Sequence, residues 1–175
     1  LSRKILNLNP KKLILLDVSE NSIYNLKAGL EKYINKKNIS FLCSNVRNSI
    51  EVEKIFSEHK PHIIYHAAAL KHVAICEENV SEAIRTNVLA THTLANLSEK
   101  YKAKCFVLIS TDKAVNPSSA MGATKKLAES IIQSKDRFSK TKTRFITVRF
   151  GNVLGSQGSV VPLFKKQISN GGPIT

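Results

Sequence analysis

The sequence predicts an α/β fold with a doubly wound parallel sheet, on three observations. Short, continuous aliphatic runs recur along the chain, and such runs are typical of strands buried on both faces of a parallel sheet. Segments with helical periodicity lie between these runs, which indicates right-handed strand-helix-strand units. Polar side chains follow the ends of the runs, where such sheets place their chemistry.

Five segments are predicted strands. The first reads Lys-Leu-Ile-Leu-Leu-Asp over residues 12–17 and is closed by an acid. The other four have the same aliphatic character, and they span 39–43, 62–66, 105–109 and 145–150.

Helical periods fill the segments between the strands, and residues 1–8 resemble the tail of a helix. Asn48 and Glu51 have the spacing of a capping box ahead of an apolar helix. Two later helices are predicted from apolar side chains at helical spacing. Their predicted buried faces are Ile84, Val88, Thr91 and Ala95 in one helix, and Leu127, Ala128, Ile131 and Ile132 in the next.

Length and charge narrow the class of protein. At 175 residues the chain fits one domain, and its composition is that of a folded globular protein. It holds 27 Lys and Arg against 13 Asp and Glu, a net charge of +14. The basic stretch 135–144 is the best candidate for contact with nucleic acid. Because no nucleic-acid motif accompanies it, we expect a solvated face and no nucleic-acid partner.

Cysteine spacing and hydropathy exclude further classes. Cys43, Cys76 and Cys105 stand far apart and are odd in number, which argues against a zinc site, a redox motif and a disulfide framework. We therefore expect reduced thiols in a cytosolic compartment, and no metal. No window holds the ~18 to 20 apolar residues that a membrane span needs, so this chain is expected to be soluble.

Asp17, which closes the first strand, is a candidate nucleotide-binding residue. Dinucleotide-binding domains place an acid here to accept hydrogen bonds from a ribose, and an acid favours NAD over NADP because it repels a 2′-phosphate. The alternative is a loop acid or a cap for the helix after Ser19. No Gly-rich turn precedes Asp17. We therefore expect residues 1–175 to be a partial domain, truncated at both ends, that lacks the first strand, the Gly-rich loop and most of the substrate-binding part.

The fourth strand delivers Thr111, Asp112 and Lys113 at its carboxyl end. Met121 and Lys125 follow at the start of a helix, four residues apart, which places them on one face about 6 Å apart along the axis. These side chains form a candidate reaction site at the sheet edge. The alternative is an exposed turn followed by a helix cap.

Three long motifs resemble those of the extended short-chain dehydrogenase/reductase enzymes that act on nucleotide sugars. They are Ser110-Thr-Asp-Lys-Ala-Val-Asn-Pro, Met121-Gly-Ala-Thr-Lys and Val148-Arg-Phe-Gly-Asn-Val-Leu-Gly-Ser. Within this family the sequence is most similar to the UDP-N-acetylglucosamine 4,6-dehydratases of the membrane-anchored polysaccharide-biosynthesis branch. Among these dehydratases the sequence most resembles the enzymes that catalyse the first step of the bacillosamine pathway of bacterial protein glycosylation. The resemblance implies a Rossmann-like fold, NAD as the cofactor and a UDP-sugar as the substrate.

The resemblance also implies catalytic roles. Asp112 would protonate the departing carbon-6 hydroxyl, Lys113 would remove the carbon-5 proton, and Lys125 would hold the nicotinamide ribose. Met121 stands where the wider superfamily has a tyrosine base, and a thioether carries no titrating proton. The carbon-4 proton would therefore pass to Thr111, to a water molecule or to Asp112.

Further residues are implied as binding residues. Asn45 stands where relatives usually have Asp at the adenine, and an amide can still hydrogen-bond a base edge. His72 is either a substrate contact or a loop residue, whereas His66 is expected in the core and Asn87 is expected to hold backbone. The implied cofactor contacts are Asp17, Ser19, Asn45, Val46, Ala67, Ala68, Ala69 and Lys125, and the implied substrate contacts are Lys71, His72, Asn152 and Ser159.

The expected function is NAD-dependent 4,6-dehydration of UDP-N-acetylglucosamine to a UDP-4-keto-6-deoxy sugar for bacterial glycan or glycoprotein synthesis. A nucleotide-sugar 4-epimerase is the nearest alternative, and a non-enzymatic nucleic-acid-binding module is a distant one. By resemblance, segments outside this chain would attach the enzyme to the bacterial inner membrane, with the catalytic domain on the cytoplasmic side. A homo-oligomer stays open, and the isolated chain is expected to be inactive.

Overall fold

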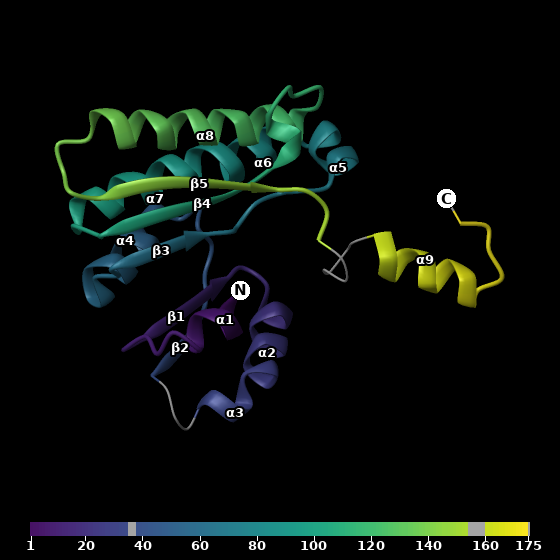
Figure 1. Cartoon of the computed structure of the whole chain (residues 1–175), viewed down its shortest axis with the longest axis horizontal. Helices are drawn as coiled ribbons and strands as arrows, with labels where there is room; N and C mark the ends of the chain where they lie inside the picture. Colours follow the sequence, from purple (N-terminus) through teal and green to yellow (C-terminus); the bar gives the residue numbers. More distant parts are fainter. Residues whose placement is uncertain (35–37, 154–159, 175) are drawn as a thin grey trace.

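The computed structural model describes residues 1–34, 38–153 and 160–174, which form a parallel α/β fold (Figure 1). All five predicted strands are confirmed, with bounds that differ by at most two residues. The strands are β1 (Leu13–Asp17), β2 (Ile39–Cys43), β3 (Ile63–His66), β4 (Cys105–Thr111) and β5 (Arg144–Phe150).

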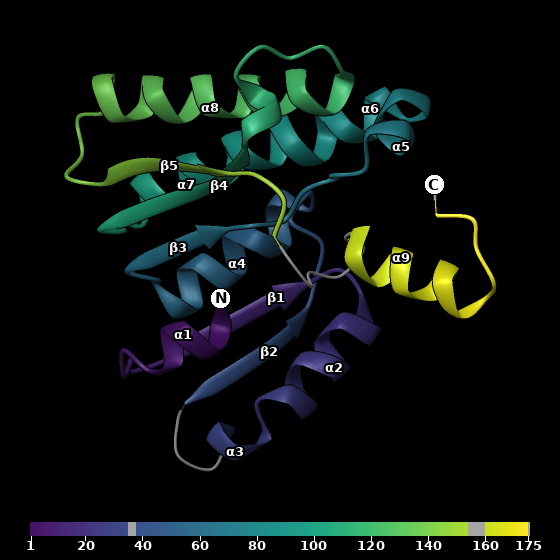
Figure 2. The same ribbon diagram turned by 45° about the vertical axis from the view of Figure 1, so that its right-hand side comes forward.

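Every strand pair is parallel. β1 pairs with β2, and a second sheet has the order β3-β4-β5. Among the described residues β1 and β3 are not paired, so the predicted sheet is present in two parts. His66 lies opposite Leu108, and Thr111 lies opposite Phe150. The carboxyl ends of β3, β4 and β5 therefore meet at one edge of their sheet, and Figure 2 shows the strands of both sheets pointing toward the same side.

Helices cover both sheets. The helix α2 packs on β1 and β2, α7 and α8 pack on β4, and α4 contacts α7 to complete one helical layer on the three-stranded sheet (Figure 1). The helices are α1 (Ser2–Leu6), α2 (Glu20–Gly29), α3 (Glu31–Ile34), α4 (Ser49–His59), α5 (Val73–Glu78), α6 (Val80–Ala83), the π-helix η1 (Ile84–Leu89), α7 (Ala90–Lys100), the 3-10 helix η2 (Asp112–Ala114), α8 (Ala120–Phe138) and α9 (Val160–Ser169).

The main core lies between the helical layer and β3-β4-β5. Alternate residues of β4 are buried, which places Phe106 and Leu108 against the helices. Phe145 of β5 packs on Phe106 with ring centroids 5.8 Å apart. Burying a side chain of this size contributes about 1.5–3 kcal/mol. The remaining members are Val52, Phe56, Leu94, Ala95, Leu97, Ala128 and Ile132.

The predicted buried helix faces are only partly correct. Thr91 and Ala95 are buried, but Ile84 at the start of the pattern is exposed. The reason is the π-helix η1, whose wider turn shifts the side chains relative to the 3.6-residue period. In α8, Ala128 and Ile132 are buried and Leu127 is exposed.

Four strands, β1, β2, β3 and β5, are less buried than predicted. The residues of β1 before Asp17 are half-buried. In β3, Ile63 and Tyr65 are 53% and 39% exposed. The helical layer covers one face of the three-stranded sheet, so alternate side chains of β3 turn away from it.

In the part of the chain that the structure describes, the helices are too short or too polar to cross a membrane. No group of His, Cys, Asp or Glu among these residues could hold a metal ion. All three cysteines are free thiols, and burial raises the pKa of Cys76 and of Cys105.

Candidate active site

The candidate reaction site begins where β4 ends. Thr111 caps η2, and its hydroxyl accepts a hydrogen bond from the Lys113 backbone N–H. The same hydroxyl donates to Asp112 Oδ1 at 2.8 Å, and Lys113 Nζ donates to that oxygen at 3.1 Å. The predicted cluster of Thr111, Asp112 and Lys113 is thus joined by direct hydrogen bonds.

Asp112 is held as a carboxylate. The hydrogen bond from Thr111 and the contact with the Lys113 ammonium lower the pKa of Asp112. A carboxylate can accept a proton but cannot give one. The resting state therefore suits Asp112 for receiving a proton before it can act as an acid.

Lys125 lies in the first turns of α8 and is 6% exposed. Its Nζ donates to the backbone carbonyl of Ile109 at 2.7 Å, so the side chain reaches β4 two residues before Thr111. Burial lowers the pKa of Lys125 to about 8, and the charge of Glu129 opposes this shift. Near neutral pH the ammonium is therefore the major form.

A buried acid lies one turn beyond Lys125. Glu129 is fully buried, accepts a hydrogen bond from Ser110 Oγ at 2.6 Å and forms a two-point ion pair with Arg149 of β5. Arg149 is the main reason that the pKa of Glu129 is lowered. Glu129 thereby fixes α8 to the carboxyl halves of β4 and β5. The sequence analysis missed this network, although four-residue spacing from Lys125 places Glu129 on the same helix face.

Met121 is buried in a small apolar cluster with Cys76, Ala83 and Leu70. Cys76 belongs to α5, whose Glu77 side chain accepts the hydrogen bond of the Ala120 N–H at 2.7 Å. The start of α8 is therefore anchored to α5 beside the candidate site.

Gly122 is the place where α8 approaches the site most closely. A Cβ atom there would lie 2.5 Å from the backbone oxygen of Lys113, and 3.2 Å from Pro117 Cβ. No flexible side chain can give way, because the nearest atom belongs to the backbone. The glycine is therefore required for the distance between α8 and the η2 turn.

Replacing Gly122 by Ala should lower the free energy of unfolding by about 1–3 kcal/mol, the usual cost of overpacking. Alanine is otherwise the better helix former by about 1 kcal/mol, so steric clash alone explains a loss. Urea unfolding of the chain measures this. Gly29→Ala is the matched control, because its Cβ would meet only the end of the Arg3 side chain at 3.2 Å. An equal loss in both variants would contradict the steric explanation.

The candidate cofactor residues lie at the carboxyl ends of β1, β2 and β3. Asp17 is exposed, and its Oδ1 accepts the Ser19 N–H at 2.9 Å. Ser19 caps α2 by accepting the Ser22 N–H, so both readings of the Asp17-Ser19 segment fit the geometry. Asn45 follows β2 and uses Oδ1 to accept from the backbone N–H and Nε of Arg47.

The loop after β3 is fixed by one buried amide. Asn87 accepts the Leu70 N–H at 2.9 Å, donates to the Leu70 carbonyl at 3.0 Å and donates to Thr124 Oγ1. This confirms the expectation that Asn87 holds backbone. It also fixes Ala67, Ala68 and Ala69, the small residues that precede Leu70.

His66 lies in the core, whereas the candidate substrate contacts that the structure describes are exposed. His66 is buried, contacts Thr91 Oγ1 at 2.9 Å and has its pKa lowered to about 3 by burial, so it is the core histidine that was expected. Lys71, His72 and Asn152 are exposed on loops, and Val46 is partly buried against the core. Ser159 lies outside the described residues.

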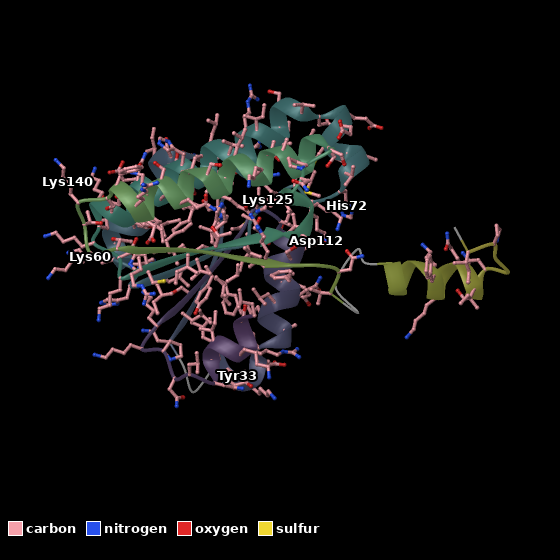
Figure 3. The ribbon with its side chains drawn as sticks, turned by 45° about the horizontal axis from the view of Figure 1, so that its top comes forward. Tyr33, Lys60, His72, Asp112, Lys125 and Lys140 are labelled. Atoms are coloured by element: carbon pink, nitrogen blue, oxygen red, sulfur yellow. The ribbon has the colours of Figure 1, made fainter. Side chains whose placement is uncertain are left out.

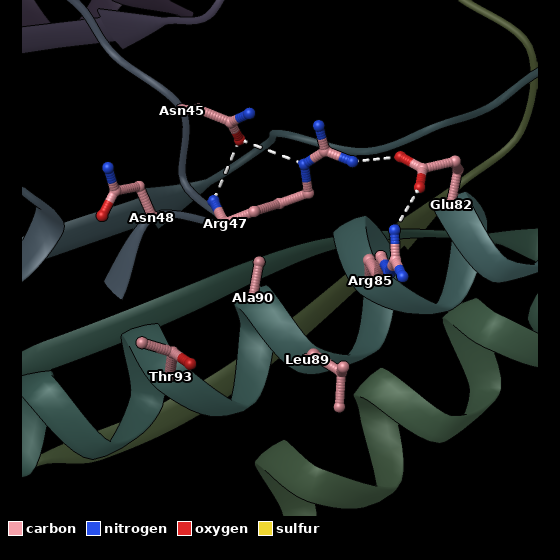
Figure 4. A pocket seen from close by; sticks show the side chains of 8 residues that line it. All are labelled: Asn45, Arg47, Asn48, Glu82, Arg85, Leu89, Ala90 and Thr93. Carbon is pink, nitrogen blue, oxygen red and sulfur yellow. Dashed lines mark hydrogen bonds and ion pairs between the residues drawn. The ribbon is translucent and has the colours of Figure 1, made fainter. Parts of the chain in front are cut away.

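A pocket of about 440 Å³ lies beside Asn45, between the loop after β2 and the helices η1 and α7 (Figure 4). Arg47, which lines the pocket, pairs with Glu82, and Glu82 also pairs with Arg85 at 2.9 Å. The ion-paired side chains of Arg47, Glu82 and Arg85 were not predicted from the sequence as site residues. The lining residues are Asn45, Arg47, Asn48, Glu82, Arg85, Leu89, Ala90 and Thr93.

Comparison with known proteins gives the family. A family model described as "Polysaccharide biosynthesis protein" matches residues 1–175. The chain belongs to this polysaccharide biosynthesis protein family.

Curated relatives agree with this family. The chain is 49% identical to the capsular polysaccharide biosynthesis protein CapD of Staphylococcus aureus over 174 residues and 44% identical to the probable polysaccharide biosynthesis protein EpsC of Bacillus subtilis. Each alignment covers 99% of this chain and 29% of the relative. The uncharacterized membrane protein MJ1061 of Methanocaldococcus jannaschii is 42% identical over 99% of the chain and 50% of its own length. The chain thus spans half or less of the length of these relatives.

Solved structures of other proteins share the fold of this chain. Pen from Bacillus thuringiensis matches with a TM-score of 0.90 and 34% identity, over 98% of this chain and 52% of that chain. The UDP-glucose 4-epimerase of Thermotoga maritima matches 96% of this chain and 58% of its own, with a TM-score of 0.80 and 24% identity. The dTDP-glucose 4,6-dehydratase DesIV of Streptomyces venezuelae covers 99% and 59%, with a TM-score of 0.81 and 20% identity. The last two similarities show the Rossmann-like fold alone.

Proposed function

We propose that the protein containing this chain is an NAD-dependent UDP-N-acetylglucosamine 4,6-dehydratase of bacterial glycan or glycoprotein synthesis. The observation that carries the proposal is the bonded cluster of Thr111, Asp112 and Lys113 beside buried Lys125. An elimination needs an acid and a base close together, and this cluster supplies both. Membership in the polysaccharide biosynthesis family supports a nucleotide-sugar substrate. We propose that the enzyme acts in the bacillosamine pathway, and the resemblance of its sequence motifs supports this assignment.

The residues present fit NAD. Asp17 Oδ1 is bound to Ser19, and Oδ2 makes no hydrogen bond among the described residues, so it can accept from a ribose hydroxyl. Asn45 would face the adenine, and Ala67 to Ala69 would let the cofactor approach the backbone. The Lys125 ammonium would hold the nicotinamide ribose. Several related structures, DesIV among them, were solved with NAD, which supports the same cofactor here.

The cluster can move protons in an order that balances. When bound, NAD would supply a hydride acceptor for carbon 4 of the sugar and the hydride that carbon 6 receives. Thr111 takes the carbon-4 hydroxyl proton and passes its own to the Asp112 carboxylate along the 2.8 Å hydrogen bond. Asp112 then gives this proton to the carbon-6 hydroxyl, which leaves as water. After its ammonium gives up a proton to solvent, Lys113 removes the carbon-5 proton, and its exchangeable protons, in equilibrium with solvent, supply the proton that returns to carbon 5.

A 4-epimerase is the second candidate function, and 39% identity over 143 residues to a UDP-glucose 4-epimerase of Rickettsia rickettsii favours it. Two features oppose it: an epimerase needs no acid and base for elimination, and Met121 replaces the tyrosine base. Turnover of UDP-N-acetylglucosamine in deuterated water separates the two reactions. Dehydration places solvent deuterium at carbon 5, whereas epimerisation does not.

Asp112→Asn in the complete protein should slow dehydration roughly 100- to 10,000-fold, because an amide cannot relay the proton. Rapid-quench product analysis measures the effect. Asp136→Asn is the matched control. Asp136 is an exposed acid of α8, far from the carboxyl end of β5, and its Oδ1 accepts the Phe145 N–H near the start of that strand. Full dehydration by Asp112→Asn would refute the relay.

We also propose that the complete protein is attached to the bacterial inner membrane through segments outside this chain, with this domain on the cytoplasmic side. The similarity to MJ1061, which is named a membrane protein, supports this attachment. Fractionation of cells that express the complete protein tests the attachment. A homo-oligomer stays a prediction that size-exclusion chromatography with light scattering tests.

A further inference from the structure

Six cations lie at the end of the molecule opposite the candidate active site. Five occupy the loops that lead into β3, β4 and β5, Arg144 is the first residue of β5, and all six side chains are exposed. Figure 3 shows Lys60 and Lys140 at one end of the molecule and His72 and Asp112 at the other. We call this set the amino-edge surface, and it consists of Lys60, Lys102, Lys104, Lys140, Lys142 and Arg144.

Buried contacts hold four of these cations in place. Thr143 Oγ1 donates to the Ala103 carbonyl at 2.7 Å, and both residues are buried. Their chain neighbours are Lys102, Lys104, Lys142 and Arg144, so the buried pair carries an exposed cation on each side. The Arg144 N–H donates to the Lys104 carbonyl at 3.0 Å, which brings adjacent strands to the usual spacing of about 4.8 Å.

The loop that carries Lys140 and Lys142 is also ordered by hydrogen bonds. Ser139 and Thr141 share a hydroxyl contact of 2.8 Å, and the Thr141 and Thr143 N–H groups bond to these hydroxyls. The cations therefore stand on a fixed base and lose little backbone freedom on binding.

These cations have no acidic partners. Among the described residues no carboxylate lies within 4 Å of any of the six, whereas some other basic residues are paired, as in Arg47–Glu82, Lys135–Glu99 and Arg149–Glu129. Part of this charge offsets the negative ends of α4, α7 and α8, which point the same way. Six unpaired cations on one edge still leave a strong positive field for an external anion.

An exposed aromatic ring adjoins the cations. Phe138, the last residue of α8, is 70% exposed and lies two positions before Lys140. The Arg137 guanidinium sits 5.3 Å from its ring centroid. An apolar ring beside basic side chains is typical of surfaces that lie at a membrane interface, where the ring enters the headgroup region.

We propose that the amino-edge surface docks on an anionic lipid bilayer. Binding there would orient the sheet so that its carboxyl edge, with the candidate active site, faces away from the membrane and stays open to a water-soluble substrate. This inference does not depend on the chemistry proposed above. A bilayer accounts for both the unpaired cations and the exposed Phe138, whereas a nucleic acid accounts for the cations alone.

Sedimentation with vesicles tests the proposal on the 175-residue chain. Binding is expected to phosphatidylglycerol–phosphatidylcholine vesicles and to weaken steeply between 50 and 500 mM salt. Each cation near an anionic surface strengthens binding about fivefold, so Lys104→Gln with Lys142→Gln should weaken it about 25-fold. The matched control, Lys165→Gln with Lys166→Gln on α9, removes the same charge and should change binding less than about threefold.

Three outcomes would overturn the proposal. One is equal binding to pure phosphatidylcholine vesicles, and another is equal loss in the two double variants. The third is tighter binding to a 20-base-pair DNA duplex than to the anionic vesicles, with the same dependence on Lys104 and Lys142, which would assign the surface to nucleic acid. If the complete protein does not dehydrate UDP-N-acetylglucosamine while the 175-residue chain still binds vesicles, only the proposed function is contradicted.

Discussion

Lys125→Met should lower the turnover of the complete protein roughly 100- to 10,000-fold while the chain stays folded. The ammonium is buried at the carboxyl edge of β4, 2.7 Å from the Ile109 carbonyl, and no other described side chain places a buried cation there. Methionine keeps the length and the apolar stem of the lysine but removes the charge. Turnover of UDP-N-acetylglucosamine measures the effect.

The same variant should lose no stability at pH 7. Burial lowers the pKa of Lys125 to about 8, whereas an unfolded lysine titrates near 10.4. Between these two values the unfolded chain binds more protons, so the contribution of Lys125 to stability rises with pH. Below pH 8 its full desolvation cost is present, and Lys125→Met removes it. Any stability that Lys125→Met gains over the parent chain should therefore shrink between pH 8 and pH 10.

Urea unfolding at pH 7 and pH 9.5 checks the direction of this change. Lys126→Met is the control, because it removes a neighbouring charge of the same helix and should change turnover less than about threefold. Turnover of Lys125→Met within tenfold of the parent would contradict the assigned role. A stability loss of several kcal/mol would make Lys125 a structural residue instead.

The sheet and its reactive edge could be predicted from the sequence because both depend on local patterns. Continuous aliphatic runs predicted all five strands, and parallel pairing places Thr111, Asp112 and Lys113 at the carboxyl edge of β3-β4-β5, whereas Asp17 ends β1 in the other sheet. The pattern failed where the backbone left regular geometry. Ile84 was expected in the core, but the π-helix turns it outward.

The interactions that set charge could not be predicted, because they join residues far apart in the chain. Glu129 and Arg149 meet only because α8 packs on β5, next to β4. The carboxylate state of Asp112 depends on the direction of the Thr111 hydroxyl. The net charge of +14 also has a location that composition does not give, since parallel strands gather the loop lysines at one edge.

Arg149→Leu should lower the free energy of unfolding measurably, because the buried Glu129 carboxylate would lose its charged partner. Glu129 is fully buried and would keep only the hydrogen bond from Ser110. The exposed pair of Arg85 and Glu82 is the control, and Arg85→Leu should cost less than about 1 kcal/mol. Urea unfolding of the 175-residue chain at pH 7 measures both.

The pH dependence of this loss separates a stranded charge from lost packing. In the parent chain Arg149 lowers the pKa of Glu129, so the pair stabilises the fold above the ordinary glutamate pKa of about 4.3 and less as the pH falls through the lowered value. In Arg149→Leu the carboxyl is expected to protonate more easily. The difference between the two chains should then shrink at pH 3.5, and Glu129→Gln added to Arg149→Leu should recover stability at pH 7. A loss that is independent of pH and unaffected by Glu129→Gln would mean that Arg149 acts through packing alone, and α8 would then be held to β5 without help from this ion pair.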